Sequence, residues 1–196
     1  MMITPTQVVA LSKNSIFFNA HGSEKSSVVK RDSPFFPDIG KDHYHRCRID
    51  TSGGGLAFRP VTGLSGHTAK HINFWDKKAA MARASDCNII CSGGFSGCVF
   101  QLWRDKDGIP VGVHAYKGTD LYADISIKAR ALGWQLLYEN NTSGKNKSGM
   151  EIFVVAVIGD DNADVIVQRI NRGVCDAVLD WHTVTKWRTN SIPALK

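Results

Sequence analysis

The chain has 196 residues, of which 43% are hydrophobic and 21% are charged, the composition of an ordinary globular protein with a sizeable core. Its formal net charge of +6 permits contact with an acidic partner, but no Lys/Arg-rich run or RNA-binding motif favours a nucleic-acid function. We expect one domain, residues 1–196, that acts as a monomer.

The five cysteines include no Cys-x-x-Cys pair, so the sequence predicts neither a metal site nor a cofactor. The first residues lack the basic and apolar regions of a secretory signal peptide, and no apolar run is long enough to span a membrane. We therefore expect the cysteines to be reduced where the protein is made.

The first third of the chain is expected to form short strands joined by polar, glycine-rich loops. Alternating polarity and β-propensity predict strands at Gln7–Leu11, Ile16–Asn19, Ser27–Val29, His43–Asp50 and Leu56–Val61.

Four histidines in this part of the chain have spacings that metal sites also use. His43 and His45 share one face of a predicted strand, but no third ligand is identifiable, so a solvated strand face is favoured. His67 and His71 are four residues apart, a helical metal spacing, but glycines precede them and an extended run follows. We discount a metal at either pair.

The next elements lead to a glycine-rich loop. Residues 77–84 are rich in helix-forming residues and predict a helix. Cys87–Cys91 predicts a short buried strand that enters the loop Ser92-Gly-Gly-Phe-Ser-Gly97 and ends at Cys98. The glycines permit a loop whose backbone amides, at Ser96 and Gly97, converge as an oxyanion hole. A plain turn before a buried, inert cysteine is the alternative.

Two β-rich runs after Cys98 predict a hairpin that returns His114 to the cysteine. A two-residue turn at Lys106-Asp107 would place Cys98 and His114 on opposite faces. A three-residue loop with Gly108 in the left-handed conformation would place them on one face, diagonally across the two strands. Glycine at the third loop position favours the second arrangement, although Asp-Gly also suits the first.

The second half of the chain alternates predicted helices and strands. Thr119 or Asp120 is expected to cap a helix that runs to Leu132, with Leu121, Ile125, Ala129 and Leu132 on its apolar face. Further along the chain we predict a strand at Trp134–Tyr138, a long hairpin tip at 140–149, a strand at Glu151–Ile158, a helix at Ala163–Asn171 and a strand at Cys175–Trp181. This order predicts an α+β fold, either a mixed β-sandwich or a strongly bent sheet flanked by two or three helices.

Ser96-Gly97-Cys98, followed by a strand and a histidine on the next strand, resembles the catalytic signature of the cytotoxic necrotizing factor catalytic domain and of Burkholderia lethal factor. These bacterial toxins deamidate a glutamine in a host protein, and the chemotaxis receptor glutamine deamidases have a similar cysteine–histidine arrangement. In the last two groups a threonine six residues before the cysteine helps to orient the histidine. The corresponding residue here is Ser92, and the resemblance is confined to residues 91–116.

The resemblance implies a hydrolase that converts glutamine to glutamate through a thioester. Cys98 would be the nucleophile, His114 the general acid and base, and Ser92 the residue that orients His114. A histidinium beside Cys98 would lower the pKa of the thiol. The substrate would be a glutamine-bearing protein such as a host GTPase.

The resemblance also implies that the protein is made in the bacterial cytoplasm without a signal peptide and is secreted or injected into a host cell. A cysteine peptidase or other acyl hydrolase, and a non-catalytic β-rich protein-binding domain, are the alternatives.

Overall fold

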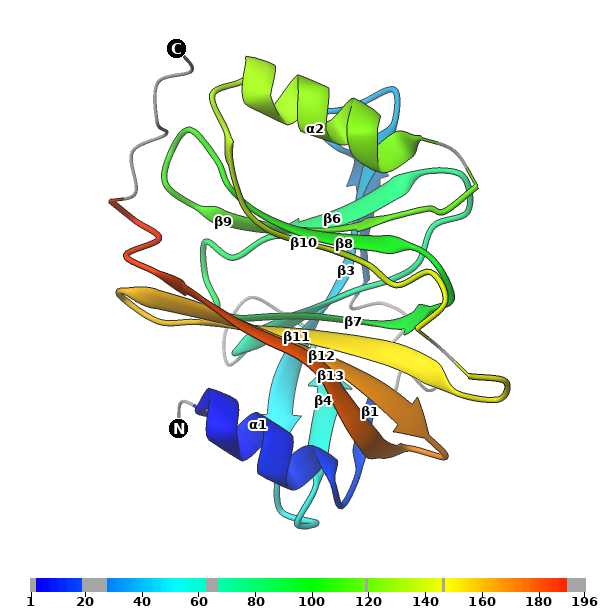
Figure 1. Ribbon diagram of the computed structural model, residues 1–196. Helices are drawn as coiled ribbons and strands as arrows, with labels where there is room; N and C mark the ends of the chain where they lie inside the picture. The colour runs from blue at the N-terminus through cyan, green and yellow to red at the C-terminus, as the bar shows by residue number, and fades with distance from the viewer. Residues whose placement is uncertain (1–2, 19–27, 63–66, 119, 146, 190–196) are drawn as a thin grey trace.

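The computed structural model describes residues 3–18, 28–62, 67–118, 120–145 and 147–189 (Figure 1). This part of the chain is mostly β-structure with two short helices. The elements are α1 (Pro5–Ser12), β1 (Ile16–Phe18), β2 (Val28–Asp32), β3 (Gly40–Asp50), β4 (Leu56–Pro60), β5 (Ala69–Ile72), β6 (Ala79–Arg83), β7 (Ile89–Phe95), β8 (Val99–Arg104), β9 (Pro110–Ala115), α2 (Leu121–Ala131), β10 (Gln135–Asn141), β11 (Glu151–Ile158), β12 (Asn162–Asn171) and β13 (Val174–Thr185).

Ten strands form a mixed sheet in the order β10-β8-β9-β6-β3-β5-β7-β11-β12-β13, and the sheet curls until it is nearly closed into a barrel. Strands β2 and β4 each pair with β3 of this sheet, and β1 pairs with β4. Side chains join the two end strands: the Tyr138 hydroxyl of β10 donates to the Asp180 carboxylate of β13, and Asn140 Nδ2 donates to the same carboxylate at 3.2 Å. Arg104 Nη1 adds a bond of 2.7 Å to the Trp187 carbonyl.

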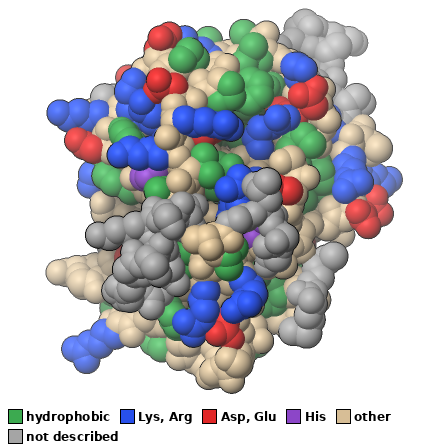
Figure 2. Space-filling view, turned by 180° about the vertical axis from the view of Figure 1, so that it is seen from behind, with side chains coloured by type: hydrophobic (Ala, Val, Ile, Leu, Met, Phe, Trp, Pro, Cys, Tyr) green, Lys and Arg blue, Asp and Glu red, His purple; other side chains and the backbone are tan. Residues whose placement is uncertain are grey.

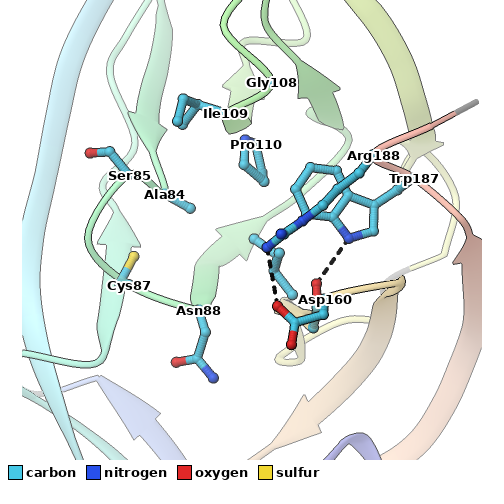
Figure 3. A pocket seen from close by; sticks show the side chains of 12 residues that line it. Ala84, Ser85, Cys87, Asn88, Gly108, Ile109, Pro110, Asp160, Trp187 and Arg188 are labelled. Atoms are coloured by element: carbon cyan, nitrogen blue, oxygen red, sulfur yellow. Dashed lines mark hydrogen bonds and ion pairs between the residues drawn. The ribbon is translucent and has the colours of Figure 1, made fainter. Parts of the chain in front are cut away.

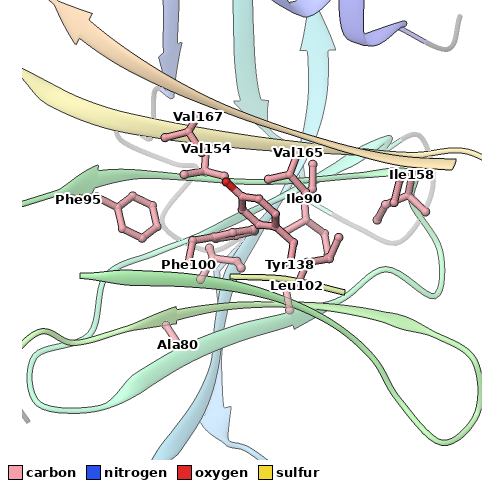
Figure 4. Close-up of a cluster of buried hydrophobic side chains, with 14 of the residues drawn as sticks. Ala80, Ile90, Phe95, Phe100, Leu102, Tyr138, Val154, Ile158, Val165 and Val167 are labelled. Carbon is pink, nitrogen blue, oxygen red and sulfur yellow. The ribbon is translucent and has the colours of Figure 1, made fainter. Parts of the chain in front are cut away.

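Period-two alternation divides the apolar side chains between the inside and the outside of this sheet. Val154, Ala156 and Ile158 of β11 join an inner cluster supplied by strands all round the barrel (Figure 4). Their neighbours on β11 face a second cluster beneath α1, and a third cluster lies between α2 and the outer side of β8 and β9. The barrel thus has a filled interior and one helix packed on each of two outer faces (Figure 1).

The segment predicted as the strand Gln7–Leu11 is instead part of helix α1. Thr4 caps this helix, because its hydroxyl accepts from the Gln7 amide at 3.2 Å and the Gln7 side chain accepts from the Thr4 amide at 2.9 Å. Pro5 at the first helical position fits the same start signal. The local capping pattern therefore decides the structure here over the apolar run that follows it.

Two predicted helices are strands, which is why the protein is mostly β rather than evenly α+β. Residues 77–84 contain β6, whose small alanines are buried between β3 and β9. Residues 163–171 form β12, in which Val165, Ile166 and Val167 alternate between the inner and outer clusters. Sheet packing overrides the helix propensity of the alanines, whereas the β-branched residues of β12 already favour a strand.

Several other predictions hold in this structure. The strands predicted at His43–Asp50, Leu56–Val61 and Cys175–Trp181 correspond to β3, β4 and β13. Helix α2 buries Leu121, Ile125 and Ala129 as expected, although the Asp120 side chain makes no capping bond. Leu132, predicted on the same face, is instead exposed, because the helix ends at Ala131. Thr119 lies outside the described residues, as do Asn19 and Ser27 at the ends of two predicted strands.

The segment 140–149 is not a hairpin tip, because β10 pairs with β8 and β11 pairs with β7 and β12. It is a connection that crosses from one side of the barrel to the other. Among the described residues, neither helix has the length and apolar character needed to cross a bilayer.

Candidate active site

The hairpin of β8 and β9 brings Cys98 and His114 to one face of the sheet. Gly108 adopts a left-handed conformation at φ 78°, and Asp105 N–H donates to the Ile109 carbonyl at 2.9 Å across the loop. This is the three-residue loop favoured by the sequence, and in its register Phe100 lies opposite His114. Cys98 and Phe100 share the inner cluster, so Cys98 lies diagonally from His114, about 7–8 Å between Cα atoms in such a geometry.

Ser92 orients His114. The Ser92 hydroxyl lies 2.8 Å from the Ile72 carbonyl, which can only accept, and 2.9 Å from His114 Nδ1. Since the single hydroxyl proton goes to the carbonyl, His114 carries its proton on Nδ1 and donates it to Ser92. The other ring nitrogen, Nε2, then has an open lone pair, and it is buried with no hydrogen-bond partner among the described residues.

Aromatic rings enclose the imidazole. Phe95 stacks on His114 with ring centroids 3.8 Å apart, and Phe74 approaches edge-on at 5.7 Å. Phe74 is itself 46% exposed, whereas His114 is 1% exposed. Burial lowers the pKa of His114 to about 3, so the imidazole is a neutral base at pH 7.

Cys98 is held in a fixed turn at the entrance to β8. Thr142 Oγ1 donates to the Cys98 carbonyl at 2.8 Å and accepts from the Gly97 amide at 3.1 Å. The Gly97 amide, expected to serve an oxyanion, is therefore already engaged. Burial raises the pKa of the Cys98 thiol, while the backbone amides of Lys117 and Ser96 and the charge of Lys117 act in the opposite direction.

The pair therefore rests as a neutral thiol and a neutral imidazole, not as the thiolate and histidinium expected from the sequence. Burial destabilises both charged forms. Two amides, those of Lys117 and Ser96, face the sulfur and remain the donors available to negative charge that develops there.

Access to Cys98 is narrow, because only 2% of its surface is exposed. The Lys117 side chain covers the preceding turn: its ammonium donates to the Ser96 carbonyl at 2.6 Å, and a Cβ at Gly97 would lie 2.9 Å from Lys117 Cδ. A substrate that reaches the sulfur over this turn must displace the Lys117 side chain.

The sequence singled out Ser92, Cys98 and His114 as candidates but gave no sign of Thr142, Lys117 or Phe74, which the structure places around them. Thr142 lies in the segment predicted as a hairpin tip, and it reaches Cys98 only because β10 pairs with β8. No local pattern marks it. Phe74 follows β5 closely, and only the order of strands in the sheet places it over His114.

A pocket of about 570 Å³ lies at the other end of the barrel from Cys98 (Figure 3). Trp187 and Arg188 form one side of it, with Arg188 paired to Asp160 at 3.2 Å, and Cys87 and Asn88 lie across from them. Burial raises the pKa of the Cys87 thiol to about 11. None of the residues that the sequence singled out for catalysis lines this pocket.

The histidines with metal-like spacings lie in other networks. His45 and His71 face each other across β3 and β5 and both contact the side-chain amide of Asn73. His67 Nε2 lies 3.1 Å from the Asp86 carboxylate. Within the described ranges, no three His, Cys, Asp or Glu side chains are arranged to hold a metal ion.

Comparisons with known proteins identify no relative: no family model, no curated protein and no solved structure matches this chain.

Proposed function

We propose that this chain is a cysteine-dependent deamidase that converts a glutamine side chain of a target protein to glutamate. The orientation of His114 carries the proposal. Ser92 fixes the proton on Nδ1, and the open lone pair of Nε2 lies on the sheet face shared with Cys98. The resemblance of residues 91–116 to the deamidase toxins supports it.

In the first half of the reaction, the Cys98 proton passes to His114 Nε2 as the sulfur attacks the carboxamide carbon of glutamine. The amides of Lys117 and Ser96 donate to the oxygen that becomes negative. His114 then gives its Nε2 proton to the nitrogen, the C–N bond breaks, ammonia leaves, and a thioester remains.

In the second half, His114 Nε2 takes a proton from water as the water oxygen attacks the thioester carbon. The C–S bond breaks, the sulfur recovers the proton from His114, and the glutamate side chain is released. A low pKa suits this cycle, because the neutral imidazole is ready to accept a proton at the start of each half-reaction.

The burial of Cys98 favours a side-chain amide over a peptide bond as the substrate. A peptidase needs an open cleft for an extended backbone, whereas Cys98 is almost fully buried beneath the Lys117 side chain. A glutamine side chain is slender and ends in the reacting group. This favours a deamidase over the peptidase alternative.

We also infer the setting of the reaction. The net charge of +6, and the Lys and Arg side chains spread over the face seen in Figure 2, favour a protein target with an acidic surface. The resemblance favours a bacterial protein that is delivered to a host cell.

The proposal is tested by incubating the chain with a panel of purified host GTPases, measuring ammonia release, and locating the converted glutamine by peptide mass mapping. We expect release with the wild type and with Cys87→Ser, a half-buried thiol far from His114, and none with Cys98→Ser. Ammonia release that persists in Cys98→Ser would show that another group is the nucleophile.

A further inference from the structure

A second pocket lies on the outer side of the sheet, away from Cys98. It has a volume of about 280 Å³ and is formed where β1, β5, β7 and β11 meet the β12–β13 turn. Its lining residues are Ile16, Phe17, Phe18, His71, Gly93, Gly94, Glu151, Phe153 and Gly173.

His71 supplies this pocket with a hydrogen-bond acceptor. Its Nδ1 lies 3.1 Å from Asn73 Oδ1, which can only accept, so His71 carries its proton on Nδ1. The Nε2 nitrogen at the far end of the side chain therefore has an open lone pair. His71 is only 6% exposed, and its Nε2 is buried with no hydrogen-bond partner in the part of the chain that the structure describes. An acceptor left unpaired in this way is costly unless a ligand pairs with it.

Aromatic rings form the walls around that acceptor. Phe18 stacks on His71 with ring centroids 3.7 Å apart and planes 2° from parallel, and Phe153 lies 5.9 Å from His71. Gly93 lets Phe153 approach, because a Cβ at Gly93 would lie 2.7 Å from the Phe153 ring. The exposed Glu151 carboxylate adds negative charge to the lining, which disfavours anions.

The size of the pocket limits its ligand. An apolar cavity of roughly 150 Å³ admits benzene, so about 280 Å³ admits a flat molecule of one or two rings. Flat aromatic walls favour stacking, and a single lone pair among them selects a molecule that carries one donor.

We propose that this pocket binds an uncharged or cationic aromatic or heteroaromatic ring whose N–H or O–H donates a hydrogen bond to His71 Nε2. The site stands apart from the proposed deamidase reaction, since none of its lining residues acts on Cys98. Its test measures ligand binding, so the result does not depend on whether Cys98 is a catalytic nucleophile.

The test compares indole with benzofuran, which has the same size and shape but an oxygen in place of the N–H. Calorimetry on the full wild-type chain is expected to show indole binding about tenfold more tightly, the effect of pairing one buried acceptor. His71→Phe keeps an aromatic ring but removes the lone pair, and is expected to bring the ratio near one. The matched control His43→Phe, on β3 and outside the pocket, is expected to keep the preference.

Nitrogen NMR of the wild type gives a readout that needs no variant. Indole is expected to shift the resonance of His71 Nε2 toward that of a hydrogen-bonded acceptor, and benzofuran is not. Equal affinities for the two compounds, no binding of indole, or bound indole with an unmoved Nε2 resonance would each overturn the proposal, even if His71→Phe fails to fold.

Discussion

Two cysteine–histidine pairs lie in the same sheet, and they differ in what surrounds the sulfur. His71 pairs with Cys91 across β5 and β7, and His114 lies diagonally from Cys98 across β9 and β8. In both pairs the imidazole has a hydrogen-bonded Nδ1, an Nε2 with no partner among the described residues, and a pKa lowered to about 3 by burial.

The two pairs differ in the burial and backbone surroundings of their cysteines. Cys91 is in the middle of β7 and fully buried, and burial raises the pKa of its thiol well above the usual range. Cys98 precedes β8 in a glycine-rich turn, where two backbone amides that no strand partner uses point at its sulfur. A shared sheet face is therefore not enough. A position at the end of a strand, with free amides, distinguishes a candidate nucleophile from a core cysteine.

The largest effect is expected from removing the sulfur of one pair and then of the other. Cys98→Ser should lower deamidase activity at least about a thousandfold, because no other group can form the thioester. Cys91→Ala should leave activity per folded molecule unchanged and only lower the melting temperature, since it opens a small cavity. If a correctly folded Cys91→Ala variant were as inactive as Cys98→Ser, the distinction between a nucleophilic Cys98 and a structural Cys91 would be wrong.

The next largest effect is expected from the base. His114→Gln should lower turnover by about 100-fold to 10,000-fold, the usual contribution of a general acid and base. His43→Gln, which changes a half-buried histidine outside both pairs, is the control and should retain full turnover. The measurement is the turnover rate of each variant on the same substrate. Wild-type turnover in His114→Gln would show that His114 is not the general acid and base.

A smaller effect is expected from the residue that orients the base. Ser92→Ala should reduce turnover by about 10-fold to 100-fold, because Nδ1 loses the acceptor that fixes its proton. Ser92→Thr keeps the hydroxyl and should restore turnover even though the added methyl group strains the core. Nitrogen NMR of His114 should show a mixture of tautomers in Ser92→Ala alone. Equal losses in both variants would indicate a packing role instead.

A last prediction concerns stability rather than turnover, and both histidines contribute to it alike. The unfolded chain protonates them near their ordinary pKa of 6.5, whereas the folded chain does so only near 3. Between these values the unfolded state binds more protons, so stability falls as the pH drops from about 6.5 to about 3. Each histidine contributes a slope of about 1.4 kcal/mol per pH unit.

Urea unfolding at pH 4, 5, 6 and 7 measures this slope. His71→Phe and His114→Phe should each remove the contribution of one proton. A slope that neither substitution changes would show that other groups govern the acid sensitivity.

The sequence was most informative where a local pattern sets the geometry. Gly108 fixed the hairpin loop and with it the shared face of Cys98 and His114. The buried positions Leu121, Ile125 and Ala129 of α2 could also be predicted from their spacing in the sequence. In both cases the decisive residues are neighbours in the chain or across one hairpin. Ser92 was named only through the resemblance, and it reaches His114 from β7 to β9, two strands that are not adjacent in the sheet.

The rest depends on contacts between distant segments. The alanines of β6 favour a helix locally, and only burial between β3 and β9 makes them a strand. The neutral state of the pair could not be predicted either, since it results from the enclosure of His114 by Phe74 and Phe95. Helix α1 is different, because its capping residues Thr4 and Gln7 were a local signal that the apolar run obscured.

The most direct measurement is the rate at which each cysteine of the native wild-type chain reacts with iodoacetamide, a reagent that carries the carboxamide of glutamine. Cys87 and Cys175 are the controls, because they are more exposed than Cys98 but lie in neither cysteine–histidine pair. We expect Cys98 to react at least about tenfold faster than both controls, because His114 takes the thiol proton as the sulfur attacks, and to lose this advantage in His114→Ala. A Cys98 that reacts as slowly as Cys91, or no faster in the wild type than in His114→Ala, would contradict the assignment of Cys98 and His114 as a catalytic pair.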